Sequence, residues 1–333
     1  MGVKVCAPAV ARSSERSSHA ARDIIVTDMP GPRDDSVRAP AVAGMFYPAD
    51  GVACRQATSQ LMDIAQASLA KNAPIGAENS AGIGAIVPHA GWICSGAIAA
   101  EAILSLARQR PSVDVVVVFG AIHTPLPIDR AVFDSHLRWL APAGETPIAA
   151  PLRSELAGRS NLFVTDDRFH QREHAVEVEL PLIQAAWPSA AILPVEVPVD
   201  PSAVEIGTTV ARAVAAAGLS AVYLASSDMT HYGPNYRFTP AGIGQAALAW
   251  AMDNDRRILR LVTDMTPEKI VPEVRTRFNA CGGGAIAAMM AACQNQGARK
   301  AVVLRHTNSY QTLAHVAPQS AENAVGYAAV WVG

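Results

Sequence analysis

Residues 113–120, which read VDVVVVFG, restrict the fold of this chain more than any other segment. A strand with one face in water alternates apolar and polar residues, whereas this run of valines does not alternate. Continuous β-branched runs are typical of strands that lie in a sheet covered by helices on both faces. The segment therefore predicts a strand near the centre of a buried sheet.

Apolar runs and amphipathic segments alternate along the rest of the chain. The other expected strands are 84–88, 131–134, 161–164, 191–199, 221–225, 301–305 and 326–332. The expected helices are 56–69, 95–107, 149–157, 173–186, 203–217, 242–262, 267–277 and 284–294. This repeated β-α-β order predicts an α/β fold with a mostly parallel central sheet and helices on both of its faces.

The first residues differ in composition from the rest. Residues 1–37 are rich in Ala, Arg, Ser, Asp and Pro, so we expect a disordered leader there. A length of 333 residues suggests about two domains at ~150 residues each. However, half of the residues are hydrophobic, and neither a linker nor an internal repeat interrupts residues 38–333. We predict one α/β domain over that range.

Charge and hydropathy exclude several classes of protein. The 27 basic and 29 acidic residues give a formal net charge of -2, which provides no general attraction to nucleic acid or anionic lipid. The longest apolar runs fall short of the ~18 residues that span a bilayer, and residues 1–22 lack the apolar core of a secretory signal. The five cysteines form no C-x-x-C pair, which favours reduced thiols. We expect a cytoplasmic protein that binds neither membranes nor nucleic acid.

Three expected strands are each followed by a histidine. His89 comes after the strand at 84–88, His123 after the strand at 113–120, and His231 after the strand at 221–225. Ligands of open α/β sheets bind at the carboxyl ends of the strands, so these imidazoles should reach one edge. A lone histidine in such a position is most often a surface residue, whereas three together favour a metal site.

Cys281 and a second polar cluster add to this expectation. Cys281 opens the segment CGGGAIAAMMAAC at a predicted helix start, where the helix dipole favours the metal-binding thiolate. A small buried residue at a tight turn is the alternative interpretation. Glu173, His174 and Glu177 either orient the ligands or simply suit the start of a helix. Cys94 and Cys293 are interpreted as core residues.

Nine segments between about residues 38 and 332 resemble those of a known family. The chain resembles the Memo-like proteins, also called AmmeMemoRadiSam system protein B, in segments that occur in the same order. These segments are RAPAVAGMFYPAD, AIVPHAGWICSG, FGAIH, WLAPAGE, REHAVEVELPL, ILPVEVP, SSDMTHY, CGGGAI and AVGYAAV.

The resemblance implies a fold similar to the catalytic subunit of class III extradiol dioxygenases, which use a mononuclear non-haem iron. It also implies that His89, His123 and Cys281 bind iron or copper, with zinc as the less favoured metal. Asp228 and His231 would line the same pocket, His231 in the position of an acid/base histidine. His174 resembles a further pocket residue.

Two departures from related patterns matter. Many family members carry a second histidine directly after the one that matches His123, and here that position is Thr124. The dioxygenases have a carboxylate where the family has a thiolate, and a soft sulfur ligand favours copper(I) or a tightly held iron. Extradiol cleavage therefore does not follow from the fold alone.

These expectations lead to one main hypothesis, a cytoplasmic metal-dependent redox protein of unknown substrate. In this hypothesis His231 transfers protons and Asp228 sets its tautomer. The family name implies association with a radical SAM protein and an AMMECR1-type partner. Two alternatives stay open. One is a non-catalytic adaptor that binds a peptide or small molecule in the same pocket, and the other is a zinc-dependent hydrolase with Glu173 or His231 as base.

Overall fold

The structure is a computed structural model that describes residues 36–71, 81–159, 161–316 and 320–333. The leader expected at 1–37 lies outside these residues except for its last two. Val37 already belongs to a strand, β1. The expectation of a disordered leader is thus not tested.

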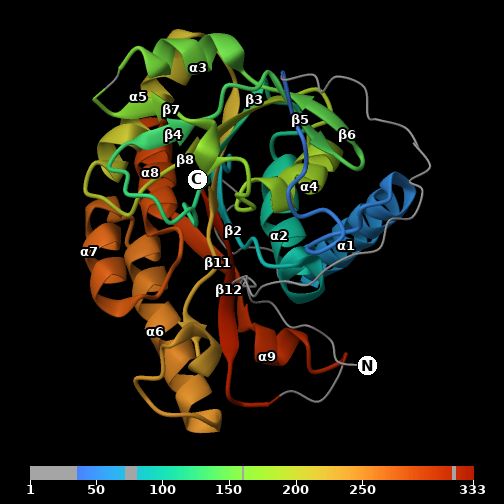
Figure 1. Ribbon diagram of the computed structural model, residues 1–333, viewed down its shortest axis with the longest axis vertical. Coiled ribbons are helices and arrows are strands. Elements are labelled where there is room, and N and C mark those ends of the chain that lie inside the picture. Colours follow the sequence, from blue (N-terminus) through green and yellow to red (C-terminus); the bar gives the residue numbers. More distant parts are fainter. Residues whose placement is uncertain (1–35, 72–80, 160, 317–319) are drawn as a thin grey trace, which may run out of the picture.

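A large mixed sheet forms the centre of the described chain (Figure 1). Nine strands in the described residues pair in the order β10-β12-β2-β9-β3-β8-β4-β7, with β11 on β12. Their bounds are β2 Gly84–Val87, β3 Val115–Gly120, β4 Ala131–Phe133, β7 Phe163–Thr165, β8 Ala191–Glu196, β9 Ala221–Ser226, β10 His231–Tyr232, β11 Ala301–Asn308 and β12 Ala324–Val332. The valine run predicted to be central is β3, and all its residues are buried.

The expectation of a mostly parallel sheet holds for the centre and for the edge pair of β4 and β7. The strands β2, β9, β3 and β8 are parallel neighbours, as β-α-β connections require. The strand β12 is antiparallel to β2, β11 and β10, and β4 is antiparallel to β8. The sheet as a whole is therefore mixed.

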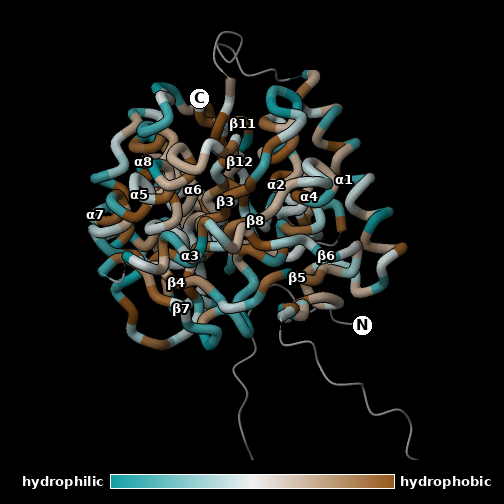
Figure 2. The backbone as a smooth tube through the Cα atoms, turned by 90° about the horizontal axis from the view of Figure 1, so that it is seen from above, coloured by the Kyte–Doolittle hydropathy of each residue, from teal (hydrophilic) through white to brown (hydrophobic). Residues whose placement is uncertain are grey.

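Helices cover both faces of this sheet. Their bounds are α1 Gly51–Lys71, α2 Trp92–Ala107, α3 Ala150–Ala157, α4 Leu180–Ala186, α5 Ala203–Ala216, α6 Gln245–Thr263, α7 Pro267–Arg277, α8 Gly283–Asn295 and α9 Ser309–Thr312. Figures 1 and 2 both place α5 to α8 on one side of the strands and α1, α2 and α4 on the other. Each helical layer builds its own buried core against one face of the sheet.

A second, three-stranded sheet lies beside the α1, α2 and α4 layer. It consists of β1 Val37–Arg38, β5 Arg138–Ala141 and β6 Gly144–Pro147 in the order β1-β5-β6. The sequence analysis did not predict these strands, nor β10 or α9. All are short. β5 and β6 form a local hairpin, whereas β1 pairs with β5 and β10 with β12 across about 100 residues of sequence.

The helix expected at 173–186 begins later than predicted. Residues 173–176 are not helical, Glu177–Glu179 forms a 3-10 turn, and α4 starts only at Leu180. The Glu173 carboxylate accepts hydrogen bonds from the backbone N–H groups of His174 and Ala175. A side chain that captures nearby backbone donors competes with helix formation, so this segment is a loop.

Two further sequence expectations concern membranes and disulfides. Within the described ranges, no helix has the length and hydropathy needed to cross a membrane. The cysteines within those ranges, Cys54, Cys94, Cys281 and Cys293, are all free thiols.

Candidate metal centre

Four loops bring polar side chains to one edge of the parallel strands. His89 follows β2, His123 follows β3, and residues 228–231 follow β9. Cys281 lies two residues before the start of α8. Because β2, β9 and β3 are parallel neighbours, their carboxyl ends meet at the same edge. The structure thus brings together the three residues predicted as metal ligands.

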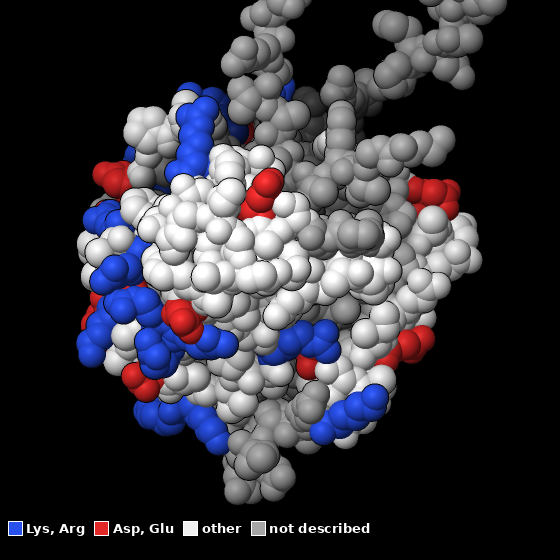
Figure 3. Space-filling view, turned by 90° about the horizontal axis from the view of Figure 1, so that it is seen from below, with Lys and Arg blue, Asp and Glu red and all other residues white. Residues whose placement is uncertain are grey.

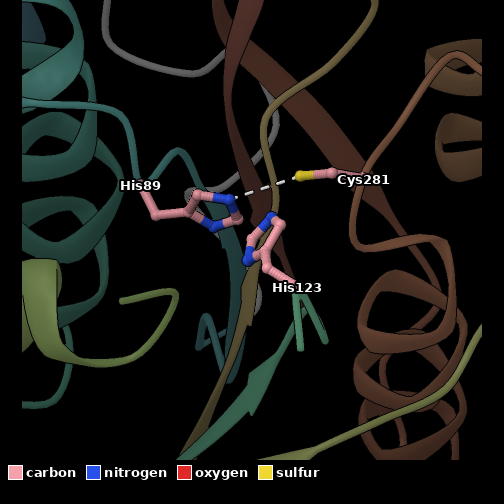
Figure 4. A group of neighbouring side chains, drawn as sticks. All are labelled: His89, His123 and Cys281. Atoms are coloured by element: carbon pink, nitrogen blue, oxygen red, sulfur yellow. Dashed lines mark hydrogen bonds between the residues drawn. The ribbon is translucent and has the colours of Figure 1, made fainter. Parts of the chain in front are cut away.

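His89, His123 and Cys281 point toward one another (Figure 4). Their ligand atoms all lie within 4.8 Å of one another. The His89 Nε2 atom is 3.3 Å from the Cys281 sulfur, and the two imidazole rings stand edge to face with centroids 5.1 Å apart. Two imidazoles and a thiol at this separation form a donor set that suits a transition metal.

Backbone contacts fix the position of the thiol. The backbone N–H of Asp228 donates to the Cys281 sulfur at 3.3 Å, and the backbone N–H of Cys281 donates to the Asp228 carbonyl at 3.2 Å. The Ser227 hydroxyl accepts from Gly282 N–H at 2.9 Å. These bonds join the loop after β9 to the start of α8, so the sequence-distant cysteine is held beside the histidines.

The contacts of His89 determine which nitrogen carries its proton. The Ser226 hydroxyl donates its only hydrogen to the Ala175 carbonyl, so it accepts from His89 Nδ1 at 2.7 Å. The Nδ1 atom is therefore protonated, and the lone pair is on Nε2, which faces the sulfur. Burial lowers the pKa of His89 well below its usual value, and the nearby imidazoles lower it further. His89 is a neutral residue that presents a ready donor atom.

His123 is held by Glu173. The Nδ1 atom of His123 is 2.8 Å from one carboxylate oxygen of Glu173, and the His123 backbone N–H donates to the other at 2.7 Å. Burial lowers the pKa of His123, but hydrogen bonds with Cys281 and Glu173 outweigh it and raise the pKa to about 11. Carboxylate–histidine pairs of this kind orient metal ligands in many sites.

His174 stacks on His123. Their ring centroids are 4.5 Å apart, and Phe46 packs on His174 with a centroid distance of 4.8 Å. Burial, followed by the charge of His123, lowers the pKa of His174 to about 4, so it is neutral at pH 7. His123, Glu173 and His174 form a second compact group of ligand atoms that shares His123 with the first.

His231 and Asp228 follow β9 at the same edge. The His231 Nδ1 atom is 3.2 Å from the Met229 carbonyl, a contact that sets its tautomer. Asp228 Oδ1 accepts from the backbone N–H of His89 at 3.0 Å and of Ala90 at 3.3 Å. These hydrogen bonds of Asp228 shape the His89 loop, in addition to the role at the His231 tautomer that the sequence analysis expects.

Arg38 organises the loop that carries Glu173 and His174. Its buried guanidinium donates to the carbonyls of His170 and Glu173 and, at 2.8 Å, to the Glu177 carboxylate. The sequence analysis placed Glu177 beside the site but missed Arg38. The buried ion pair between Arg38 and Glu177 joins residues 139 positions apart. No local pattern in the sequence predicts such a contact.

Three other residues singled out in the sequence are not candidate ligands. Thr124 donates to the Phe169 carbonyl at 3.3 Å. Cys94 and Cys293 are buried in opposite core layers, as interpreted from the sequence. Two histidines outside the candidate ligand set pair with buried carboxylates, His170 with Glu196 and His306 with Asp255.

Comparison with known proteins identifies the family. The profile described as "Memo-like protein" matches residues 38–331, nearly all of the described chain. The chain belongs to the Memo-like family. Three relatives are archaeal proteins named as MEMO1 family members, and the matches cover nearly the whole length of each.

The relative from Methanococcoides burtonii is 32% identical over 285 residues, covering 82% of this chain and 93% of the relative. The relative from Methanosarcina acetivorans is 30% identical over 304 residues, covering 89% of this chain and 99% of the relative. The relative from Pyrococcus horikoshii is 27% identical over 301 residues, covering 88% of this chain and 98% of the relative. In this Memo-like protein, the family segments around His89, His123, Asp228 and Cys281 meet at one edge of the sheet.

Proposed function

We propose that this Memo-like protein is a metal-dependent redox protein that holds iron(II) or copper on His89, His123 and Cys281. The convergence of these three donor atoms within 4.8 Å, from three separate loops, carries the proposal. The donor set fits such a metal, because Ser226 and Glu173 occupy the Nδ1 atoms and both Nε2 atoms would coordinate, that of His123 after the metal displaces its proton. Imidazole and thiolate together suit iron or copper better than magnesium or calcium.

The surrounding residues have distinct roles in this proposal. A bound iron or copper would supply a redox-active Lewis acid with positions left for oxygen or substrate. Burial, with the charge of His123, lowers the pKa of His231 to about 4, so its imidazole is neutral at pH 7. With Nδ1–H directed at the Met229 carbonyl, the Nε2 atom of His231 is left as the acceptor and would take a proton from a substrate in the pocket. His174 and Phe46 border the same space.

The cellular setting is part of the proposal. We place the protein in the cytoplasm, acting on a small molecule or a peptide together with a radical SAM protein and an AMMECR1-type partner. The family name supports this association.

The first test is elemental analysis of protein purified without a metal-binding tag. We expect near-stoichiometric iron or copper in the wild type and its loss in His89→Ala. Cys293→Ala is the control, since Cys293 is a buried thiol near the C-terminal end of α8, outside the proposed ligand set. Oxygen consumption by the metal-loaded protein then tests redox activity. Metal-free wild-type protein after anaerobic reconstitution would refute the proposal.

An apolar groove favours a second candidate, a non-catalytic adaptor. A groove of about 390 Å³ is lined by Met45, Phe46, Ile64, Trp92 and Ile93, among others, and Phe46 also touches His174. Phage display of peptides on the wild type, His89→Ala and Ile93→Glu separates the candidates. An adaptor keeps its peptides in His89→Ala and loses them in Ile93→Glu. Selection of no peptide would eliminate the adaptor.

A zinc hydrolase that uses Glu173 as base receives less support. Burial raises the pKa of Glu173, but its bonds to His123 and the charge of His174 lower it to about 2. A carboxylate so weakly basic, with both oxygens already accepting hydrogen bonds, is a poor proton acceptor. Zinc in the purified protein together with oxygen-independent ester or amide turnover would revive this alternative, with His231 as base.

A further inference from the structure

A cavity lined mainly by arginines lies between α6 and α7, and it shares no residue with the candidate metal centre. Its volume is about 330 Å³. The lining residues are Trp250, Asp253, Asn254, Arg256, Arg257, Arg260 and Arg277. Figure 3 shows Lys and Arg side chains gathered on this side of the molecule, on the left where α6 and α7 lie in Figure 1.

The arrangement of these residues follows from the helical repeat. Trp250, Asn254, Arg257 and Arg260 are spaced three or four residues apart in α6, so they share one face of that helix. Arg277 is the last residue of α7. The buried Asn254 amide donates to the Arg277 carbonyl at 3.0 Å, which ties the end of α7 to the floor of the cavity.

Two of the four arginines are already neutralised. Arg257 forms a two-pronged ion pair with Glu273, at 2.8 and 3.3 Å, and Arg256 pairs with Asp253. The side chains of Arg260 and Arg277 have no hydrogen bond or ion pair within the described residues. A local excess of positive charge therefore lies in one concave site, although the whole chain has a net charge of -2.

We infer that this cavity binds a small phosphate ester. Arg260 and Arg277 would bind the phosphate oxygens, because the planar guanidinium matches phosphate geometry with paired N–H donors. The ring of Trp250 provides an apolar wall for the organic part. The cavity is at the small end of the ~300–1,000 Å³ range of ligand sites, which excludes a large ligand.

Fixed neighbours surround the two arginines that would bind the phosphate. Arg257 is held by Glu273, and Glu273 also accepts from the buried Asn279 amide at 3.3 Å. Binding at Arg260 and Arg277 thus orders only two long side chains, which limits the entropic cost. A nucleic acid would need a longer track of phosphate contacts than this single cavity provides.

Calorimetric titration with pyrophosphate, adenosine 5′-monophosphate and adenosine tests the inference. We expect both phosphates to bind and adenosine to fail. The double variant Arg260→Ala/Arg277→Ala should lose affinity about tenfold or more, because charge-assisted bonds to phosphate are among the strong ones. Arg212→Ala is the matched control, since Arg212 is an exposed arginine on α5, and it should bind as the wild type does.

Phosphates also coordinate metals, so the titration uses chelator-treated protein and is repeated in His89→Ala. Binding that persists in His89→Ala but fails in the arginine variant assigns the phosphate to the cavity, whatever the metal centre does. Binding that is lost in His89→Ala and kept in the arginine variant would overturn the inference. So would binding of oligonucleotides or heparin with no binding of either small phosphate. Circular dichroism checks that each variant is folded.

Discussion

Cys281 and Thr124 both lie near the predicted ligands, yet the structure gives them different roles. The Cys281 sulfur is 3.3 Å from His89 Nε2, whereas the Thr124 hydroxyl donates to a backbone carbonyl. We expect Cys281→Ser to weaken metal binding by about 10- to 100-fold or more, because serine replaces a thiolate with a neutral hydroxyl. Thr124→Ala should change it little. Competition with a chelator of known affinity measures both; equal losses would show that the ligand set is wrong.

The environment of Glu196 predicts how the free energy of unfolding depends on pH. It is fully buried, with one oxygen 3.0 Å from Nδ1 of the equally buried His170. Burial raises the pKa of Glu196 from 4.5 to about 7, although His170 opposes the rise. Burial lowers the pKa of His170, but Glu196 outweighs it and the net direction is upward.

Both shifts have the same consequence for folding. The folded state retains protons that the unfolded chain releases as pH rises from 4.5 through 7, so the free energy of unfolding falls over this interval. We expect Glu196→Gln to remove roughly 2–3 kcal/mol of this fall between pH 5 and pH 8. Urea denaturation of both proteins at several pH values measures it. Parallel pH curves for the two proteins would contradict the assignment.

The close packing of α5 against α8 requires a glycine at position 207. A Cβ atom added at Gly207 in α5 would lie 1.9 Å from the Ala288 carbonyl oxygen in α8. Alanine has the higher helix propensity by about 1 kcal/mol, but the clash forces the two helices apart. We therefore expect Gly207→Ala to lower the free energy of unfolding by about 2 kcal/mol or more, measured by chemical denaturation.

The matched control for this prediction is Ala216→Ser, at an exposed position of the same helix. It should change stability by no more than about 0.5 kcal/mol. Because α8 begins two residues after Cys281, Gly207→Ala should also weaken metal binding. A stable Gly207→Ala protein would mean that the two helices do not approach as closely as described.

The central sheet separates two cores, and β3 contributes to both. Val117 packs in the core under α5 to α8, and the adjacent Val118 packs in the core under α1, α2 and α4. We predict that Val117→Ala and Val118→Ala each lower stability by roughly 1–3 kcal/mol and that each protein still unfolds in one transition. Chemical denaturation followed by far-UV and near-UV circular dichroism measures both predictions, and the two curves should coincide for each variant. Two separate transitions would show that the faces unfold as independent units, against the single domain predicted.

The sequence by itself determined the elements that depend on local pattern. The unbroken valines of β3 identified a strand buried on both faces, and the helical spacing identified most helices to within a few residues. The position of histidines directly after strands was enough to predict that His89 and His123 would meet, because parallel strands end at a common edge. The helix start after Cys281 made this thiol a candidate ligand, and the family resemblance placed it in the same set as His89 and His123.

Only the tertiary structure decided the features that depend on distant partners. These include the antiparallel edges of the sheet, the small sheet of β1, β5 and β6, and the buried Arg38 that holds the Glu173 loop. They also include the orientation of His89 through Ser226 and the pocket where Arg260 meets Arg277. Local sequence records propensity and periodicity, whereas a hydrogen bond or ion pair between remote residues exists only once the chain has closed the loops between them.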